Sequence, residues 1–230
     1  MRWLATAIIA LVAGFAGAAL FSLSGLGDNQ TREWLIANPE VLPEAMDELQ
    51  RREMLARITP LRGELETPFP GAVLGNPQGS ITLVEFTDYA CSYCRQSIPD
   101  VTQLISENPD LRVVVREYPI LTPESAEAAR MALAAAQQGK FEDFHFAMFA
   151  QGQVSAESIE AAALQAGLDL DLANSIIATG QLDAQLQNNV FLARNIGLTG
   201  TPSWIIGDRA LNGAVGADAI GRAIAEARES

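Results

Sequence analysis

The sequence predicts an α/β domain in which a long helical segment interrupts the strands, preceded by a smaller helical region. Three observations support this fold class. A β-branched strand pattern at 81–88 leads through a helical segment into a Val-rich strand at 111–119. A run of helical segments then covers about 122–196. A strand pair and a helix end the chain, so the expected order is β-α-β, helical insertion, β-β-α.

The first residues have the composition of an export signal. Arg2 precedes an uncharged apolar run that closes near the small residues at 16–18. We expect residues 1–26 to be a Sec-type signal peptide. A membrane anchor over residues 4–26 is the alternative, because the run is long enough to span a bilayer. In both cases the remainder is exported, and exported compartments are usually oxidising.

Residues 27–60 are predicted to form a helical arm. Apolar residues recur at helical spacing among charged ones over residues 29–58. Pro39 and Pro43 interrupt this pattern, which favours a short helix, a turn and a longer helix from about Pro43. So small a helical pair cannot bury its apolar stripe alone. It must therefore pack on another copy of itself or fold back on the main domain.

The stretch at 61–79 is rich in proline and glycine. This composition predicts a linker or extended lead-in. We expect the main domain to cover 80–230, with its first strand at the start. The helix that begins at Cys91 has Asp88 before it as a candidate cap, and Pro99 inside it predicts a kink.

Cys91 and Cys94 are the chain's two cysteines. Four interpretations compete: a redox-active dithiol, a metal site, a static disulfide, and two unrelated core residues. The last is disfavoured because the chain has no other cysteine. A static disulfide that closes so short a loop would restrict the unfolded chain little, and it would therefore stabilise the fold weakly.

A metal site is limited by the ligands available. Structural zinc takes four ligands, and the chain lacks a second cysteine pair and has one histidine, His145. A two-coordinate Cu(I) site stays open, because thiolates select that soft ion. We otherwise expect no metal and no separate cofactor, with a Cys91–Cys94 disulfide as the redox group.

Redox chemistry fits the position of the pair. A thiol at a helix N-terminus faces unsatisfied N–H groups and the positive end of the helix dipole, which lower the pKa of Cys91. Cys94 lies one turn further into the helix and is better shielded. The sequence therefore favours Cys91 as the nucleophile and Cys94 as the resolving thiol.

The segment VEFTDYACSYCR resembles the active-site segment of the thioredoxin superfamily, and in particular of DsbA-like exported thiol:disulfide oxidoreductases. The matching features are the CxxC motif, an acid before it, a proline after it and a Thr-Pro pair before a later strand. The residues that carry these features are Glu85, Cys91, Cys94, Pro99, Thr201 and Pro202. The resemblance covers about 80–228 and implies a thioredoxin fold with a DsbA-type helical insertion.

The resemblance also implies site roles. Glu85 corresponds to a buried acid beneath the dithiol, and Thr201-Pro202 to a cis-proline loop that faces it. Burial in an apolar strand would raise the pKa of Glu85 and let it shuttle a proton to or from Cys94; an exposed strand residue is the alternative. Pro202 lacks an N–H and would fix the Thr201 backbone for pairing with a peptide; an ordinary turn proline is the alternative.

The chain departs from the DsbA pattern between the cysteines. Ser92 and Tyr93 stand where DsbA-like oxidases often carry Pro-His or Pro-Tyr. Without an imidazole to stabilise the thiolate, we expect a less oxidising site than that of DsbA, with the Ser92 hydroxyl as a hydrogen-bond donor to the sulfur. Thr201 before the proline is more similar to disulfide isomerases. The choice between oxidase, isomerase and reductase is therefore open.

The segment NPEVLPEAMDELQRRE is similar to the N-terminal helical region of ScsC-type proteins, which mediates self-association. This resemblance implies a dimer or trimer formed through residues 29–58, with several CxxC sites facing a shared space. Such an arrangement favours disulfide shuffling. An arm folded back on its own domain is the alternative.

Other features exclude several function classes. A formal net charge of −13 argues against a nucleic-acid surface, which needs clustered Lys and Arg. His145 lies in FEDFHFAMFA, where aromatic residues at helical spacing predict core packing; a lining for an apolar substrate groove is the alternative. With one histidine and no nucleophile motif, a hydrolase triad lacks support.

The sequence thus predicts an exported oxidoreductase, periplasmic or otherwise extracytoplasmic, that forms or shuffles disulfides through Cys91 and Cys94. Its expected partners are unfolded or wrongly oxidised exported proteins and, from the resemblance, a membrane redox partner. The alternative is a protein that binds or transfers Cu(I) with the same two thiols.

Overall fold

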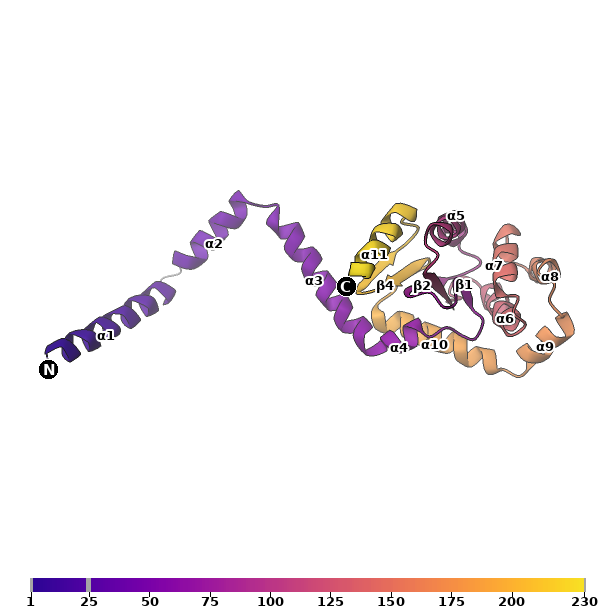
Figure 1. Cartoon of the computed structure of the whole chain (residues 1–230), viewed down its shortest axis with the longest axis horizontal. Helices are drawn as coiled ribbons and strands as arrows, with labels where there is room; N and C mark the ends of the chain where they lie inside the picture. The colour runs from indigo at the N-terminus through magenta and orange to yellow at the C-terminus, as the bar shows by residue number, and fades with distance from the viewer. Residues whose placement is uncertain (1, 24–25, 230) are drawn as a thin grey trace. The chain divides into compact units, whose positions relative to one another are not determined.

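The computed structural model describes residues 2–23 and 26–229, and the chain divides into two compact units, Met1–Gln50 and Arg51–Ser230. The first unit holds α1 (Arg2–Leu23), α2 (Leu26–Ala37) and the start of α3 (Val41–Ile58) (Figure 1). In the part of the chain that the structure describes, no helix is both long and apolar enough to cross a membrane.

The expected short helix, turn and longer helix of the arm are all present. The backbone N–H and the side-chain amide of Asn38 both donate to the Trp34 carbonyl oxygen, at 2.9 and 2.8 Å, just after α2 ends. α3 begins at Val41 instead of Pro43, because proline is tolerated in the first turn of a helix. The exposed large apolar residues of the arm are Trp34, Ile36, Leu42, Met46 and Leu49.

The second unit is built around a five-stranded sheet with the order β1-β3-β2-β4-β5. Its strands are β1 (Val73–Gly75), β2 (Ile81–Thr87), β3 (Leu111–Glu117), β4 (Ser203–Ile206) and β5 (Arg209–Asn212). β2 and β3 are parallel, with α5 (Ser92–Glu107) between them in the chain, and the other pairs are antiparallel. The predicted β-α-β unit and the later strand pair are therefore confirmed.

The helical insertion lies close to its predicted range. Its helices are α6 (Pro123–Gln137), α7 (Phe141–Ala150), α8 (Ala156–Gln165), α9 (Leu170–Ala178) and α10 (Gln181–Ile196). The Thr122 and Ser155 side chains accept hydrogen bonds from backbone N–H groups three residues on and cap α6 and α8. After the last strand, α11 (Ala217–Glu229) completes the described chain.

The stretch at 61–79, predicted to be a linker, is part of the folded domain. Its elements are the end of a 3₁₀ turn (Thr59–Leu61), α4 (Arg62–Glu66) and β1. Leu65, Ala72 and Leu74 are fully buried, and so is Ile58 at the end of α3. The linker prediction was wrong because these elements are too short to show a periodicity, while proline and glycine dominate the composition.

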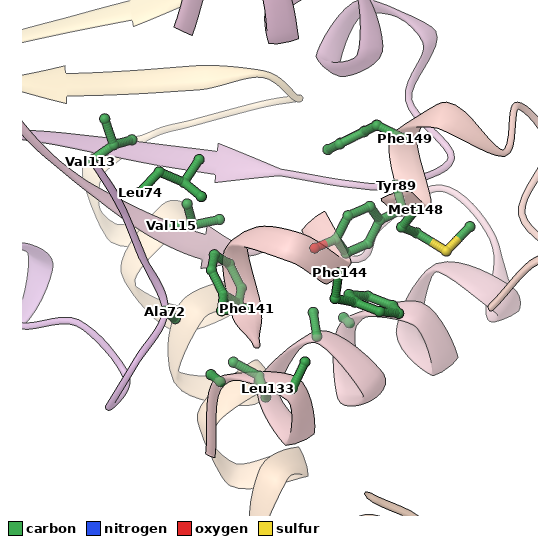
Figure 2. Packing of buried hydrophobic residues seen from close by; sticks show 14 of the residues in the cluster. Ala72, Leu74, Tyr89, Val113, Val115, Leu133, Phe141, Phe144, Met148 and Phe149 are labelled. Atoms are coloured by element: carbon green, nitrogen blue, oxygen red, sulfur yellow. The ribbon is translucent and has the colours of Figure 1, made fainter. Parts of the chain in front are cut away.

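Separate hydrophobic clusters cover the two faces of the sheet. The α5 face, which packs on α5, α6, α7 and α11, includes Leu83 and Val115. The α10 face, which packs on α4, α10 and the end of α3, includes Phe86 and Val114. Figure 1 shows α5 and α11 on one side of the sheet and α4 and α10 on the other. Figure 2 shows aromatic side chains of α7 packed near strand residues of the α5 face.

Candidate functional site

Both cysteines lie where β2 leads into α5. Cys91 occupies the cap position before the first helical residue, and Cys94 lies in the first turn. Pro99 is inside the helix, as the sequence predicted. The two sulfurs are free thiols in this structure. The fold thus places them at the N-terminus of a helix, beyond the carboxyl end of a central strand.

Asp88 does not cap α5, contrary to the sequence-based expectation. Its carboxylate accepts hydrogen bonds from the backbone N–H groups of Ala90, Ile120 and Leu121, at 2.8, 2.8 and 3.0 Å. The last two follow β3, so the carboxylate ties the turn before Cys91 to the end of the neighbouring strand. Asp88 therefore stabilises the position of the nucleophile from outside the helix.

The Cys91 thiol is the more accessible and the more acidic of the two. Its residue is 6% exposed, and its sulfur lies 3.2 Å from the Thr201 carbonyl oxygen, to which it donates a hydrogen bond only while it is protonated. The pKa of Cys91 falls to about 5, chiefly because the Cys94 thiol hydrogen-bonds to its sulfur; Thr201 and backbone N–H groups of α5 add to this, and burial opposes it. Cys91 is therefore a thiolate at neutral pH, which is the nucleophilic form.

Cys94 has the opposite environment. It is fully buried, and burial raises its pKa far above that of a free thiol; its hydrogen bond to the Cys91 sulfur raises it further. Cys94 therefore stays protonated until a nearby base accepts its proton. This arrangement matches the requirement of a resolving thiol.

Glu85 lies beneath the dithiol in β2, opposite Val115 of β3. It is fully buried, which rules out the exposed strand position, and burial raises its pKa to about 8. Neither carboxylate oxygen has a hydrogen-bond partner in the structure. A carboxyl that titrates near neutral pH can accept a proton and return it, as a proton shuttle must.

The loop before β4 faces the nucleophile. The Thr201–Pro202 peptide bond is cis, and the Thr201 carbonyl oxygen contacts the Cys91 sulfur. The Pro202 carbonyl oxygen accepts a hydrogen bond from the Gly213 N–H at 2.8 Å, which ties the loop to the segment after β5. The structure therefore brings Glu85, the two cysteines and the Thr-Pro pair into one site, although they come from distant parts of the chain.

Ser92 and Tyr93, the residues between the cysteines, face solvent. Both are exposed, Tyr93 at 60%. The groups that lower the pKa of Cys91 include the backbone N–H of Tyr93 and do not include the Ser92 hydroxyl. The predicted Ser92 hydrogen bond is therefore wrong, because the first helical residue projects to solvent while its successors present backbone N–H groups to the sulfur.

Three buried residues near the site were not identified from the sequence: Thr87, Tyr89 and Glu117. Glu117 follows Val115 at the two-residue spacing of a strand, so this alternation was the available signal that it shares a face with Glu85. His145 was predicted to pack in the core, and it is fully buried; burial lowers its pKa to about 3, so its imidazole is neutral.

Among residues 2–23 and 26–229, no group of three or more His, Cys, Asp or Glu side chains is arranged to hold a metal ion. The two sulfurs alone would have to hold a soft ion such as Cu(I). The chemistry that the described arrangement supports directly is exchange between a thiolate and a disulfide.

Fold and site together define a thioredoxin-type dithiol domain. The family model described as thioredoxin matches residues 69–226, and the chain belongs to this family. A shorter match, over residues 32–54, is to the N-terminal domain of the copper resistance protein ScsC. The predicted thioredoxin fold and the resemblance to DsbA-like and ScsC-type proteins are thereby confirmed.

Solved structures agree with this assignment. A thioredoxin-like oxidoreductase from Silicibacter pomeroyi is 38% identical, with a TM-score of 0.66 over 69% of this chain and 92% of that one. The thiol-disulfide exchange protein α-DsbA2 from Wolbachia pipientis is 29% identical, with a TM-score of 0.69 over 79% and 97% of the two chains. Proteus mirabilis ScsC in a transitional conformation is 28% identical, with a TM-score of 0.68 over 86% and 91%.

Curated relatives match over only part of their length. The Na(+)/H(+) antiporter NhaA 1 of Salinispora arenicola is 29% identical over 158 residues, which are 67% of this chain and 24% of the antiporter. The chain thus spans about a quarter of the length of this relative. The similarity concerns the domain and not the whole of either protein.

Proposed function

We propose that this protein is an exported thiol:disulfide oxidoreductase, an oxidase or isomerase, that forms or shuffles disulfides in extracytoplasmic proteins. The observation that carries this proposal is the opposite environment of Cys91, with a pKa lowered to about 5, and of Cys94, with a raised one. Membership of the thioredoxin family and similarity to a thiol-disulfide exchange protein support it.

The proposed reaction begins at Cys91. Its thiolate attacks one sulfur of a substrate disulfide, which forms a mixed disulfide and releases the other substrate sulfur as a thiolate. Cys94 then attacks the Cys91 sulfur, releases the second substrate sulfur and gives its proton to Glu85. In the reverse direction these steps oxidise a substrate dithiol, and Glu85 returns the proton to Cys94.

The surroundings of Cys91 suit a substrate in an unfolded state. The exposed apolar side chains Tyr93, Ile120, Leu121 and Val215 come from three segments that adjoin the site. Ile120 and Leu121 are held by Asp88, and Val215 follows the segment that bonds to Pro202. Such a set of apolar groups can contact the side chains that unfolded or wrongly oxidised proteins expose.

Refolding of scrambled ribonuclease tests the proposal. The wild type should restore ribonuclease activity in a redox buffer, and Cys91→Ser should abolish the effect. Cys94→Ser is the matched variant, because it keeps the nucleophile and should accumulate mixed disulfides instead of releasing product. Equal refolding with wild type and Cys91→Ser would contradict the proposal.

The reduction potential of the dithiol separates oxidase from isomerase. We propose a less oxidising site than that of DsbA, because Ser92-Tyr93 provides no imidazole between the cysteines. Equilibration with glutathione should therefore give a potential below roughly −120 mV, the value typical of DsbA. A potential at or above that value would reject this part of the proposal.

Self-association through residues 29–58 is a further part of the proposal. The short match to the ScsC N-terminal domain and the exposed apolar side chains of α2 and α3 support it. Light scattering of the mature protein should give a dimer or trimer. Leu49→Glu should yield monomers, whereas the control Glu44→Gln on the same helix should not. A monomeric wild type with the arm intact counts against self-association.

Cu(I) binding is the second candidate function, because one family match is described as a copper resistance protein. The thiolates of Cys91 and Cys94 are the ligands such an ion would use. Competition with a chromophoric Cu(I) chelator should then show one site in the wild type and none in Cys91→Ser. Cu(I) binding together with no effect on scrambled ribonuclease would favour this candidate.

We propose an extracytoplasmic location, with residues 1–26 as a signal peptide, and a membrane protein as redox partner. A related structure is that of a periplasmic thioredoxin-like protein from Salmonella enterica. Cell fractionation with N-terminal sequencing of the recovered protein tests location and cleavage together. Recovery of the intact chain from the cytoplasm would reject export.

A further inference from the structure

A hydroxyl and two carboxyls share the α5 face of the sheet beneath the dithiol. Thr87 lies directly opposite Glu117 in the parallel register of β2 and β3. Glu85 lies two residues before Thr87, so its side chain is on the same face. Diagonal neighbours of this kind on adjacent strands lie about 7–8 Å apart, within reach of long side chains. All three residues are buried, with at most 1% exposed.

Polar atoms of these residues have no partners. Both carboxyl oxygens of Glu85, one oxygen of Glu117 and the Thr87 hydroxyl make no hydrogen bond of standard geometry. Buried polar groups are almost always hydrogen-bonded, because an unpaired one has lost its bonds to water without replacement. Three such residues on one patch therefore weaken the fold, which suggests that they are retained for chemistry.

The Thr87 hydroxyl is close enough to act on both the resolving thiol and an acid. Burial raises the pKa of Cys94 and of Glu85, and the Thr87 hydroxyl lowers both, although it forms no hydrogen bond of standard geometry with either. A hydroxyl can donate one proton while it accepts another. Hydrogen bonds used in catalysis are often long in a free enzyme and shorten in the reacting complex.

Glu117 is held by a hydrogen-bond chain from the helical insertion. The Tyr89 hydroxyl donates to Glu117 Oε1 at 3.0 Å, and the same hydroxyl lies 3.1 Å from Nδ1 of His145 in α7. Figure 2 shows Tyr89 among Phe144, Met148 and Phe149. This chain fixes one oxygen of Glu117 and leaves the other free on the face that carries Glu85.

The titratable groups around this patch come from several elements. They are Glu85 of β2, Asp88 and Tyr89 of the following turn, Cys91 and Cys94 at the start of α5, Glu117 of β3 and His145 of α7. Burial raises the pKa of Glu117 well above its usual value, and the charges of Asp88 and Glu85 add to this. Within the described residues, no Lys or Arg forms an ion pair with Glu85 or Glu117.

We propose that Thr87 and Glu117 belong to the redox site, with the Thr87 hydroxyl carrying a proton between the Cys94 thiol and two coupled carboxyls, Glu85 and Glu117. This inference rests on the proposed disulfide exchange and adds a relay and a second acid to it. Two carboxylates this close repel each other, so Glu85 and Glu117 do not both lose their protons. One proton stays on the pair while Glu85 gives up and takes back the other.

The step balances without any further reactant. The Cys94 sulfur bonds to the Cys91 sulfur while the bond between Cys91 and the substrate sulfur breaks, and the substrate sulfur leaves with the electron pair as a thiolate. The Cys94 proton passes to the Thr87 oxygen as the Thr87 proton passes to a carboxylate. Reduction of the substrate sulfur and oxidation of Cys94 are complete in this exchange.

A two-phase reaction with dithiobis(nitrobenzoic acid) separates the steps. Attack by Cys91 on the reagent releases the first nitrothiobenzoate, and resolution by Cys94 releases the second. The ratio to measure is the rate of the second release, by Cys94, to the rate of the first release, by Cys91. In Thr87→Val this ratio should fall at least about tenfold at neutral pH. Thr87→Ser keeps the hydroxyl and should restore most of that ratio. A ratio unchanged in Thr87→Val would overturn the relay.

The second acid is tested by adding Glu117→Gln to Glu85→Gln. Burial keeps the pKa of Glu117 raised, and Glu85→Gln removes one charge that raises it further; Glu117 is then the remaining buried carboxyl opposite Thr87 that can exchange a proton. The double variant should therefore resolve at least about threefold more slowly than Glu85→Gln, and its pH profile should lose the remaining inflection. The amide introduced by Glu117→Gln keeps an oxygen that accepts from Tyr89, so the packing is retained. Identical profiles for the single and double variants would overturn the role of Glu117.

The same traces distinguish the inference from the proposed function. A wild type that releases no second equivalent would reject disulfide exchange itself. A wild type that releases both, with unaltered ratios in the Thr87 and Glu117 variants, would reject this inference alone. If Thr87→Val fails to fold, as judged by its unfolding transition, the pair of Glu variants still decides whether a second acid acts.

Discussion

The two faces of the central sheet both bury charged residues, and they do so in opposite ways. On the α10 face, Arg116 is 2% exposed and donates to Asn189 Oδ1 at 3.2 Å. Its guanidinium also donates to the carbonyl oxygens of Glu64, Leu65 and Thr67, around and beyond the end of α4. On the α5 face, the oxygens of Glu85 have no such partners.

The difference in hydrogen bonding between Arg116 and Glu85 indicates different roles for the two buried residues. A buried charge with several hydrogen bonds joins the segments that supply the acceptors, here α4, β3 and α10. A buried acid without partners costs stability and has a pKa shifted toward neutral pH. The buried charge on the α10 face thus links segments of the domain, whereas the buried acids on the α5 face lower its stability and are the groups to which the proposed function assigns acid–base chemistry.

The largest expected effect is the pH dependence of the unfolding free energy that Glu85 causes. Its pKa is raised from 4.5 to about 8, so the folded state binds this proton more tightly than the unfolded state. Stability from this group is therefore complete below pH 4.5 and is lost as pH rises through about 8. At about 1.4 kcal/mol for each pKa unit, the loss is up to about 5 kcal/mol.

Urea unfolding of the reduced protein at a series of pH values measures this loss. Glu85→Gln should make the loss of unfolding free energy between pH 4.5 and 8 smaller, and the part that remains belongs to Glu117, whose pKa burial also raises. The control is Asp208→Asn, because Asp208 forms a partly exposed ion pair with Arg62. This variant should lose unfolding free energy with rising pH as the wild type does. Parallel curves for wild type and Glu85→Gln would contradict the assignment of Glu85 as an unpaired acid.

Arg116→Met should have the next largest effect, a loss of about 3–4 kcal/mol of unfolding free energy. The substitution keeps apolar volume and leaves the carbonyl oxygens of α4 without a donor. Urea unfolding at constant pH measures this loss of unfolding free energy. The pKa of Cys91, followed by the absorbance of its thiolate, should be the same in the variant and in the wild type. A large change in the pKa of Cys91 would show that the two faces of the sheet do not act independently.

Tyr89→Phe should lower the unfolding free energy by less, about 1–2 kcal/mol. The ring still packs on Phe144 and Phe149, but the hydrogen bond to Glu117 and the contact with His145 are lost. The same unfolding measurement, compared with Tyr118→Phe on the α10 face, shows whether the hydroxyl matters. Equal stability of Tyr89→Phe and wild type would argue against the hydrogen-bond chain.

Arg62→Ala should have the smallest effect, at most about 1 kcal/mol. Arg62 forms ion pairs with Asp208 at 2.7 Å and Glu66 at 3.1 Å, but its side chain is 33% exposed, so solvent screens both. The difference from wild type in urea unfolding should shrink further when salt is added. A loss as large as that of Arg116→Met would show that α4 is held mainly by Arg62.

Much of the fold could be predicted from local signals. Strand patterns located β2 and β3, and helical spacing located the insertion over about 122–196, because both signals depend on residues close in the chain. The short elements of 61–79 could not be found in this way. Their place in the domain depends on pairing with β3 and on burial of Leu65 and Leu74.

The site residues likewise fall into those that local sequence could predict and those that it could not. The sequence by itself determined the dithiol at a helix N-terminus and an acid in an apolar strand, since Cys91, Cys94 and Glu85 lie within ten residues of one another. Only the tertiary structure decided that Thr87 faces Glu117, and that Tyr89 links Glu117 to His145. Those contacts require the register of two strands and the docking of α7, which no local pattern specifies.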